Sequence, residues 1–327
     1  MTPPTAPSTA AQARLLADVG GTNARFAWQD HAHAPLTHVR VLPGAEYPTL
    51  QAAMRAYIDG VGLGEPTEAA IAIANPITGD AVRMTNHHWA FSQNAVRAEF
   101  GLRRLRLLND FTALALALPD LTPEQLRQVG GQTAVADAPK ALLGAGTGLG
   151  VSGLLPNGQG GWVPVQGEGG HVTLPAETVR ERVLVDGLTA RYGHPSSERL
   201  LSGQGLLDAF EILCAADGAA VSGINSPAAV TEAALQARHP QAVEALGLFC
   251  ALLGSCAGNL ALTLGARGGV YIGGGIAPRL GRALDASAFR ARFEAKGRFS
   301  DYLREIPVWV ITADPSPALL GAARALD

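Results

Sequence analysis

Short apolar runs, most of them closed by glycine or a polar residue, alternate along this chain with longer segments of helical periodicity. In the first third, the short runs predict strands at 14–18, 24–28, 37–42, 69–74 and 105–108. Apolar residues three or four positions apart predict helices at 48–57, 94–100 and 111–118. The predicted order is therefore three strands, a helix, a strand, a helix, a strand and a helix.

A similar pattern starts again after residue 118. Apolar runs divided by glycine turns predict strands at 140–144, 149–155, 161–165, 269–272 and 307–312. Helical spacing predicts helices at 177–192, 205–216, 227–239, 242–264 and 316–326. The second part thus repeats the plan of the first, with inserted helices.

This repetition predicts two α/β domains of related plan with a ligand cleft between them. We expect a small domain at 14–118 plus about 313–327, and a large domain at 119–312. Residues 1–13 are rich in Pro, Thr and Ala and lack the basic and apolar regions of a signal peptide. We expect them to form a disordered tail.

Composition and charge narrow the classes of protein. The 327 residues are 47% hydrophobic, which suits a globular protein with a sizeable core. A formal net charge of −3 leaves no basic excess for phosphate neutralisation, so we expect no nucleic-acid partner. The longest apolar stretch, 242–264, contains Glu244, Ser255, Asn259 and Thr263, and is interpreted as a buried helix and not a membrane span.

The cysteines indicate a reducing compartment. Cys214, Cys250 and Cys256 lack any CxxC or zinc-like spacing and have apolar neighbours, as buried thiols do. A reactive or metal-binding cysteine is the alternative. We expect a cytoplasmic protein.

Four loops follow predicted strands directly, at 18–25, 109–110, 144–150 and 273–276. Three of them are rich in glycine, which lets backbone N–H groups approach phosphate oxygens. Any one loop could be an ordinary turn, but three loops spread over both halves favour a phosphate site. The G-x-x-x-x-G-K-[ST] pattern is absent. A G-x-G-x-x-G match at Gly148, Gly150 and Gly153 is followed by Pro156 and more glycines, which cannot form the helix that a dinucleotide site requires.

Asp18 gives the first loop a specific chemistry. A carboxylate beside a phosphate is repelled unless a cation lies between them, and Mg²⁺ that keeps several waters is the usual cation. Thr22 and Asn23 can donate hydrogen bonds to phosphate oxygens. The alternative is an aspartate that only shapes the turn.

A second set of polar residues suits a ligand with adjacent hydroxyl groups. Asn109 and Asp110 end a strand, and Asp110 is either a general base for a hydroxyl proton or merely a helix N-cap. Glu168 and His171 are separated by glycines that allow both to face one ligand, and Glu198 lies at a helix start. A zinc site is the alternative, but one histidine with scattered acids is weak support for it.

Seven strings make the chain resemble the bacterial glucokinases, the non-zinc hexokinase group of the actin/hexokinase/Hsp70 superfamily. They are "ADVGGTNARFA", "IANPITGDAVRMTNHHWAF", "LLNDFTALALALP", "GAGTGLGVSGL", "EGGH", "SSERLLSGQGL" and "YIGGGIAPR". They extend from residue 17 to about 280. The resemblance implies an α/β, two-domain actin-like ATPase (ribonuclease H-like) fold with an inter-domain cleft, and phosphorylation of the glucose 6-hydroxyl by ATP.

The resemblance also implies roles for individual residues. The ATP-binding set would be Ala17, Asp18, Val19, Gly20, Gly21, Thr22, Thr147, Gly148, Gly274 and Gly275. The sugar-binding set would be Asn109, Asp110, Glu168, His171 and Glu198, with Asp110 also the catalytic base. Mg²⁺ would bind near Asp18 through water, Asn86 would shape the sugar loop, and the protein would be a homodimer.

Two local departures bear on these expectations. Ala17 stands where many relatives have glycine, a small change. The related kinase–repressor family carries a cysteine-rich zinc motif after its EGGH-like string, whereas 172–188 contains no cysteine. We therefore expect no structural zinc.

Three rival functions remain open. A kinase for mannose, fructose or an N-acetylated hexosamine would need a similar residue set. A sugar-sensing repressor would need a DNA-binding module, and the 13 residues before the first strand are too few for one. A non-catalytic filament protein would have no use for the clustered hydroxyl-binding residues.

Overall fold

The computed structural model describes residues 12–85, 87–314 and 316–327. The chain divides into two compact units, one of Met1–Leu121 with Asp314–Asp327 and one of Thr122–Ala313. Of the expected tail, only residues 12 and 13 lie in the described part, and the Ala13 carbonyl accepts hydrogen bonds from the Thr67 and Glu68 N–H groups. Asn86 lies outside the described residues.

The first unit is built on a five-stranded mixed sheet in the order β3-β2-β1-β4-β7. Its strands are β1 (Arg14–Val19), β2 (Asn23–Gln29), β3 (Thr37–Pro43), β4 (Glu68–Ile73) and β7 (Arg104–Asn109). The β1–β2 and β2–β3 pairs are antiparallel, and β4 is parallel to both β1 and β7. Every residue of β4 is buried, which explains why 69–73 is a continuous apolar run and not an alternating one; the first residue, Glu68, forms ion pairs with Arg14 and Arg103.

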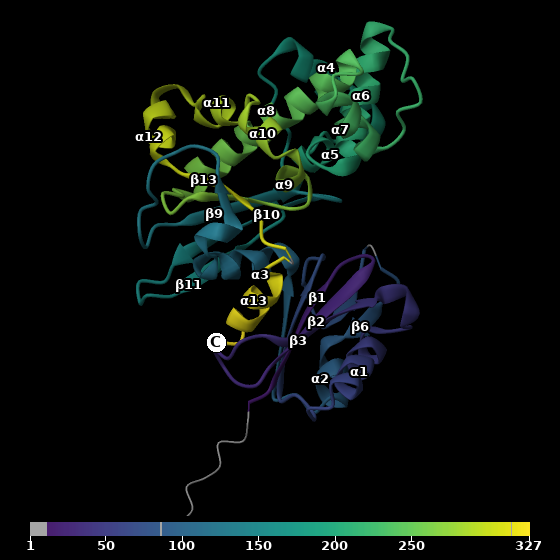
Figure 1. Ribbon diagram of the computed structural model, residues 1–327, viewed down its shortest axis with the longest axis vertical. Helices are drawn as coiled ribbons and strands as arrows, with labels where there is room; N and C mark the ends of the chain where they lie inside the picture. Colours follow the sequence, from purple (N-terminus) through teal and green to yellow (C-terminus); the bar gives the residue numbers. More distant parts are fainter. Residues whose placement is uncertain (1–11, 86, 315) are drawn as a thin grey trace, which may run out of the picture. The chain divides into compact units, whose positions relative to one another are not determined.

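Helices cover both faces of this sheet (Figure 1). They are α1 (Leu50–Val61), α2 (Gln93–Glu99), α3 (Asp110–Ala117) and α13 (Ala318–Arg324). Leu15 and Ala17 of β1 pack toward α1, whereas Leu16 packs toward α13, because side chains alternate along a strand. Thr49 and Ser92 cap α1 and α2 by accepting backbone N–H bonds, which explains where these helices begin.

The second unit holds a six-stranded mixed sheet in the order β11-β10-β9-β12-β13-β8. Its strands are β8 (Leu126–Gln128), β9 (Lys140–Ala145), β10 (Leu149–Pro156), β11 (Trp162–Gln166), β12 (Val270–Gly273) and β13 (Val308–Ile311). Its helices are α4 (Val179–Tyr192), α5 (Ser197–Leu200), α6 (Gly203–Asp217), α7 (Pro227–Leu235), α8 (Pro240–Leu264), α9 (Ile276–Leu280), α10 (Arg282–Asp285), α11 (Phe289–Glu294) and α12 (Ser300–Glu305). Strand β10 is antiparallel to both β9 and β11, and β13 is antiparallel to β8. Strand β12 is parallel to both its neighbours, β9 and β13.

Helix α8 is the central helix of the second unit. By length and composition it could span a membrane, but 67% of its apolar 18-residue window is buried inside the unit. Phe249, Leu252 and Leu253 lie in the main hydrophobic core of that unit, and α11 packs against Gly254 of α8. The prediction of a buried core helix is therefore confirmed.

The cysteines are free and largely shielded. Cys214 and Cys250 are buried and Cys256 is half-buried. Burial raises the pKa of Cys250 to about 11 and also raises the pKa of Cys256. These thiols are thus held in their protonated, unreactive form.

Some short elements differ from the sequence expectations. The helix predicted at 227–239 ends at Leu235, because Ala237 has a positive φ and the chain turns before Pro240 begins α8. The hairpin of β5 (Ala81–Arg83) and β6 (Ala90–Ser92), strand β8 and the helices α9–α12 were not predicted. Each has six residues or fewer, too few to show a clear periodicity.

Candidate active site

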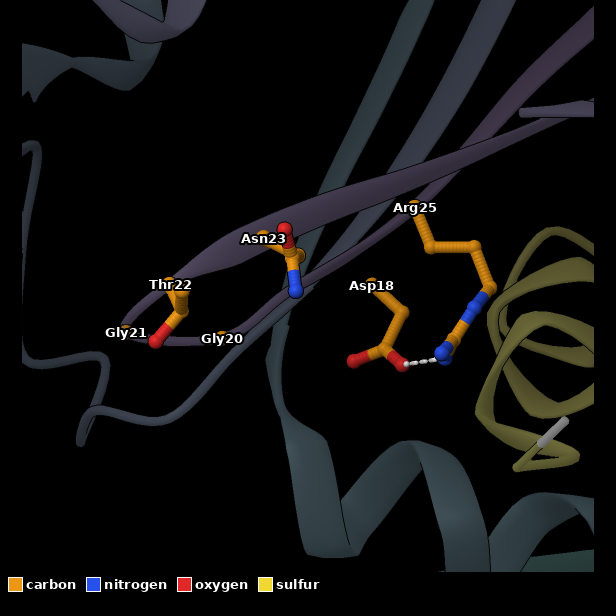
Figure 2. Close-up of a pocket in the computed structure, with 6 residues that line it drawn as sticks. All are labelled: Asp18, Gly20, Gly21, Thr22, Asn23 and Arg25. Carbon is orange, nitrogen blue, oxygen red and sulfur yellow. Dashed lines mark hydrogen bonds and ion pairs between the residues drawn. The ribbon is translucent and has the colours of Figure 1, made fainter. Parts of the chain in front are cut away.

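The first glycine loop is the tight turn between β1 and β2. The Gly20 N–H donates to the Asn23 carbonyl (2.9 Å), which closes the turn and aligns Asp18 with Arg25 across the two strands. A pocket of about 280 Å³ opens here, as Figure 2 shows. It is lined by Asp18, Gly20, Gly21, Thr22, Asn23 and Arg25. The structure therefore brings together most of the residues expected for the first phosphate loop.

Asp18 and Arg25 form an ion pair beside this turn. Arg25 Nη1 donates to Asp18 Oδ2 at 3.0 Å, and the other carboxylate oxygen points away from Arg25 (Figure 2). Burial raises the pKa of Asp18, and the nearby Arg25 charge offsets part of this shift. Asp18 is thus a shielded carboxylate that pairs with Arg25 through one oxygen and directs the other oxygen away from this partner.

Arg25 was not among the predicted site residues. The sequence contains Arg25 but does not fix its partner, because a two-residue turn at Gly20 and Gly21 would pair residue 18 with residue 23, whereas the observed turn of residues 20–23 sets residue 25 opposite residue 18. Ala17 and Val19, by contrast, direct their side chains into the core of the first unit. These two residues therefore offer only backbone atoms to a ligand.

The second glycine loop, residues 146–149, joins β9 to β10. The Gly146 N–H donates to the Gly148 carbonyl (2.8 Å), and the Gly146 carbonyl accepts from the Gly203 N–H (2.9 Å). The Leu149 N–H donates to Glu198 Oε2 at 2.9 Å. Thr147 is exposed at the tip of this loop, where it is available to a ligand.

The third glycine loop lies directly against the second. A Cβ on Gly144 would overlap the backbone of Gly273, and one on Gly274 would overlap the backbone of Ala145. Gly274 also has φ +76°, a conformation that favours glycine. Backbone contact therefore joins the end of β9 to the end of β12, and Gly275 is exposed beside them.

Asn109 and Asp110 mark the junction of β7 and α3. The helix cap is Asn109, whose Oδ1 accepts from the N–H groups of Phe111 (2.9 Å) and Thr112 (3.3 Å). The alternative that Asp110 is the N-cap is therefore wrong, and Asp110 is the first residue of the helix. Its Oδ1 accepts from the Phe111 N–H at 2.9 Å, and both side chains are half-buried.

Asp18 and Asp110 lie at the same end of the first sheet, where the parallel strands β1, β4 and β7 have their carboxyl ends. Strands β1, β4 and β7 are parallel, with Val19, Ile73 and Asn109 in register. Two strand spacings separate β1 from β7, which corresponds to about 10 Å. Ligands of α/β proteins bind at such carboxyl ends of parallel strands.

Glu168, His171 and Glu198 belong to the second unit. Glu168 and His171 are exposed; Glu168 precedes the turn Gly169–His171, and His171 ends it, with its N–H donating to the Glu168 carbonyl. Glu198 lies in α5, which Ser196 caps. The Ser197 N–H donates to the Val172 carbonyl at 2.8 Å, so the two segments lie side by side.

Residues on both sides of position 86, which itself lies outside the described residues, form hydrogen bonds with more distant parts of the chain. Asn75 Oδ1 accepts from the Thr85 N–H (2.9 Å), and its Nδ2 donates to the Arg83 carbonyl (3.1 Å). Trp89 Nε1 donates to the Tyr47 carbonyl at 2.9 Å. This role of Asn75 was not predicted from the sequence, although Asn75 opens the "NPITG" turn after β4.

Within the described residues, no group of three or more His, Cys, Asp and Glu side chains could hold a metal ion. Mg²⁺ needs no such group, because it retains several waters and often uses one or two carboxylates plus substrate phosphates. Asp18, with one oxygen turned away from Arg25, fits this mode of binding.

Comparisons with known proteins agree on one family. The family model described as Glucokinase matches residues 15–327. A curated glucokinase of Chromobacterium violaceum is 54% identical over 95% of this chain and 88% of its own length. The crystal structure of a glucokinase from an Antarctic psychrotroph is 34% identical, with TM-score 0.87, and covers 96% of this chain and 98% of that one.

A more distant structure shares the fold. A ROK family glucokinase from Streptomyces griseus, solved in complex with glucose and AMPPNP, has TM-score 0.61 and 20% identity, with coverage of 96% of this chain and 98% of that one. Together these structures confirm an α/β fold of the actin-like ATPase superfamily with mixed sheets.

Proposed function

The chain belongs to the glucokinase family, and on that premise we propose which of its residues carry the ATP-dependent phosphorylation of glucose at the 6-hydroxyl. The observation that supports this most directly is the pocket at the β1–β2 turn, where Asp18 and Arg25 lie beside two glycines and two small polar side chains. Such a lining suits a phosphate group that is accompanied by a cation. The ROK family glucokinase from Streptomyces griseus was solved in complex with the ATP analogue AMPPNP.

We assign the polyphosphate to the glycine loops. The first loop comprises Gly20, Gly21 and Thr22, with backbone from Ala17 and Val19, and the second comprises Thr147 and Gly148. Gly274 and Gly275, whose backbone packs on the second loop, would lie by the adenosine. Bound Mg²⁺ would neutralise charge on the β- and γ-phosphates, with Asp18 as its protein partner through water.

We assign the sugar hydroxyls to Asn109, Asp110, Glu168, His171 and Glu198. Since Oδ1 of Asn109 is engaged in the helix cap, its NH₂ group is the part left to donate to a hydroxyl. Asp110 accepts the proton of the 6-hydroxyl as that oxygen bonds to the γ-phosphorus and the bond to the β-phosphate oxygen breaks. The products are glucose 6-phosphate and ADP, and the proton resides on the Asp110 carboxylate.

Replacing Asp18 by asparagine should separate activity from stability. We expect kcat/KM for ATP to fall by about a hundredfold, because the charge that attracts the cation is lost. The folded-state pKa of Asp18 is raised by burial, so its ionised form costs stability, and that cost grows as the pH rises through this pKa. The neutral variant should therefore unfold at the same or a higher temperature at pH 7 than the parent protein.

Kinetics and thermal melts at pH 7 and at pH 4 test this expectation. The stability advantage of Asp18→Asn should shrink at pH 4, where the parent carboxylate takes up its proton more readily. A variant that keeps the parent kcat/KM would contradict the assignment of Asp18. Asp59→Asn, an exposed aspartate on α1, is a matched control.

Sugar preference is tested with a panel of hexoses. We expect kcat/KM for glucose to exceed that for mannose, fructose and N-acetylglucosamine by at least about tenfold, because a site that hydrogen-bonds particular hydroxyl groups discriminates against sugars that place them differently. A coupled assay of ADP release measures this for each sugar. A preference for one of the other hexoses would identify the chain as a kinase for that sugar.

We also propose that the protein forms a homodimer and is cytoplasmic, as the family resemblance implies. Light scattering coupled to size-exclusion chromatography measures the mass directly. A mass near 34 kDa, that of one chain, would contradict the dimer.

A further inference from the structure

The second glycine loop is held from outside by one short stretch of chain. Glu198 Oε2 accepts from the Leu149 N–H at 2.9 Å, and the Gly203 N–H donates to the Gly146 carbonyl at 2.9 Å. Both contacts come from the segment 198–203, at α5 and the start of α6. The loop that we assign to the nucleotide phosphates is therefore shaped by the segment that carries a proposed sugar ligand.

Glu198 occupies the space that a side chain at position 148 would enter. A Cβ on Gly148 would overlap the Glu198 carboxylate, with Oε2 nearest and Cδ next at 3.1 Å. The φ angle of Gly148 is not positive, so its backbone conformation alone would accept alanine. The excluded space at Gly148 is thus occupied by a side chain that could rotate away, and such a rotation would break the bond to Leu149.

The other sugar segment meets the same loop residue. A Cβ on Gly170, between Glu168 and His171, would overlap the Leu149 carbonyl oxygen. The N–H of Leu149 is thus bound by Glu198 while its carbonyl packs against Gly170. All these atoms belong to the second unit.

We propose that Glu198 is a positioning residue for the nucleotide as well as a ligand of the sugar. Oε2 fixes the Leu149 N–H and thereby the orientation of Thr147 and Gly148, while Oε1 remains to accept a sugar hydroxyl. A bound sugar then restrains the carboxylate that orders the phosphate loop. Sugar and nucleotide therefore strengthen each other's binding by the same factor. This inference rests on the proposed function, since it takes the sugar and phosphate roles from there.

Titrating sugar-free protein with Mg·AMPPNP in a calorimeter tests the positioning role directly. Glu198→Ala should weaken AMPPNP binding about tenfold, because the loop loses a charge-assisted hydrogen bond. Glu198→Gln should bind AMPPNP within about twofold of the parent, because its amide oxygen can still accept from the Leu149 N–H. Glu198→Gln should also raise KM for glucose about tenfold, because the NH₂ group that replaces one carboxylate oxygen cannot accept a hydrogen bond from a hydroxyl.

Glu168→Ala is the matched control. Glu168 is a proposed sugar ligand that is exposed and makes no hydrogen bond to the second glycine loop within the described residues. Its loss should raise KM for glucose and leave AMPPNP binding to the sugar-free protein unchanged. If Glu168→Ala weakens AMPPNP binding as much as Glu198→Ala does, the specific role of Glu198 is overturned.

A double-mutant cycle with Gly148→Ala adds a test that keeps every atom of Glu198. In the parent, the new methyl group should displace the carboxylate and weaken AMPPNP binding. In the Glu198→Ala background, the same substitution should have little further effect, because the two changes remove one contact. If Glu198→Ala does not fold, Gly148→Ala alone decides.

The proposal is overturned if Glu198→Ala binds AMPPNP as tightly as the parent. If Glu198→Ala does not fold, the same result for Gly148→Ala overturns it. It is also overturned if Glu198→Gln binds AMPPNP as weakly as Glu198→Ala. These outcomes are distinct from failure of the proposed function. A parent protein that phosphorylates no hexose would refute that function, whereas the nucleotide titrations contain no sugar and measure the loop alone.

Discussion

Asp110→Ala is expected to lower kcat for glucose by about a thousandfold, while KM for glucose changes only severalfold. A general base contributes roughly 10²–10⁴ to a rate, and its removal leaves the 6-hydroxyl without a proton acceptor. The fold should survive, because the cap of α3 is Asn109, and Asp110 follows it as the first residue of the helix. A coupled ADP-release assay gives kcat and KM, and circular dichroism reports the folded state.

Asp110→Asn refines this test, because it keeps the shape and the acceptor oxygen toward the Phe111 N–H while it loses basicity. We expect it to be nearly as inactive as Asp110→Ala. Asp59→Asn, at an exposed position of α1, controls for the loss of one negative charge. Near-normal turnover in a folded Asp110→Ala protein would remove Asp110 from the mechanism.

Gly321→Ala should have the largest effect on stability. Gly321 lies in α13 where that helix packs against α3, and a Cβ there would overlap the carbonyl oxygen of Ala113. Because this neighbour is backbone, no side-chain rotation can relieve the overlap, and the helices must separate. We expect the free energy of unfolding to fall by about 3 kcal/mol, at the upper end of overpacking costs. Denaturant unfolding of the first unit measures it.

Gly247→Ala offers a control of opposite sign. Gly247 is an exposed position of α8, and a Cβ there would meet no other atom within 4 Å. Alanine in an exposed helix interior is favoured over glycine by about 1 kcal/mol, so this variant should be slightly more stable than the parent. Equal stability of Gly321→Ala and the parent would show that α13 does not pack closely on α3. A shift of α3 would also lower kcat, because Asp110 begins that helix.

Much of the fold was predictable because burial leaves a periodic trace in the sequence. Strand β4 is buried on both faces and shows a continuous apolar run after Glu68, while α8 repeats its apolar residues every three or four positions. Helix starts at Ser92 and Ser226 carry side chains that accept backbone N–H bonds. These are local signals, so the long elements could be placed without knowing what they pack against.

Short elements were not predictable for the same reason. Between Ile276 and Glu305 the chain forms four helices of four to six residues, divided by glycines such as Gly281 and Gly297 with positive φ. One turn of helix shows no periodicity, and its stability comes from packing against the rest of the unit. Strand β8 likewise exists because it pairs with β13.

For the site, the sequence by itself determined the chemical groups and the strand ends that carry them. The glycine turns, Asp18, Asp110 and the EGGH string all follow from local composition, and their strings are specific enough to indicate the glucokinase family. Only the tertiary structure decided which group acts on which. It paired Arg25 with Asp18, gave the helix cap to Asn109, and set the Glu198 carboxylate on the Leu149 N–H. The last contact joins residues 49 positions apart, and no local periodicity records it, because it arises only when separate segments pack around a common core.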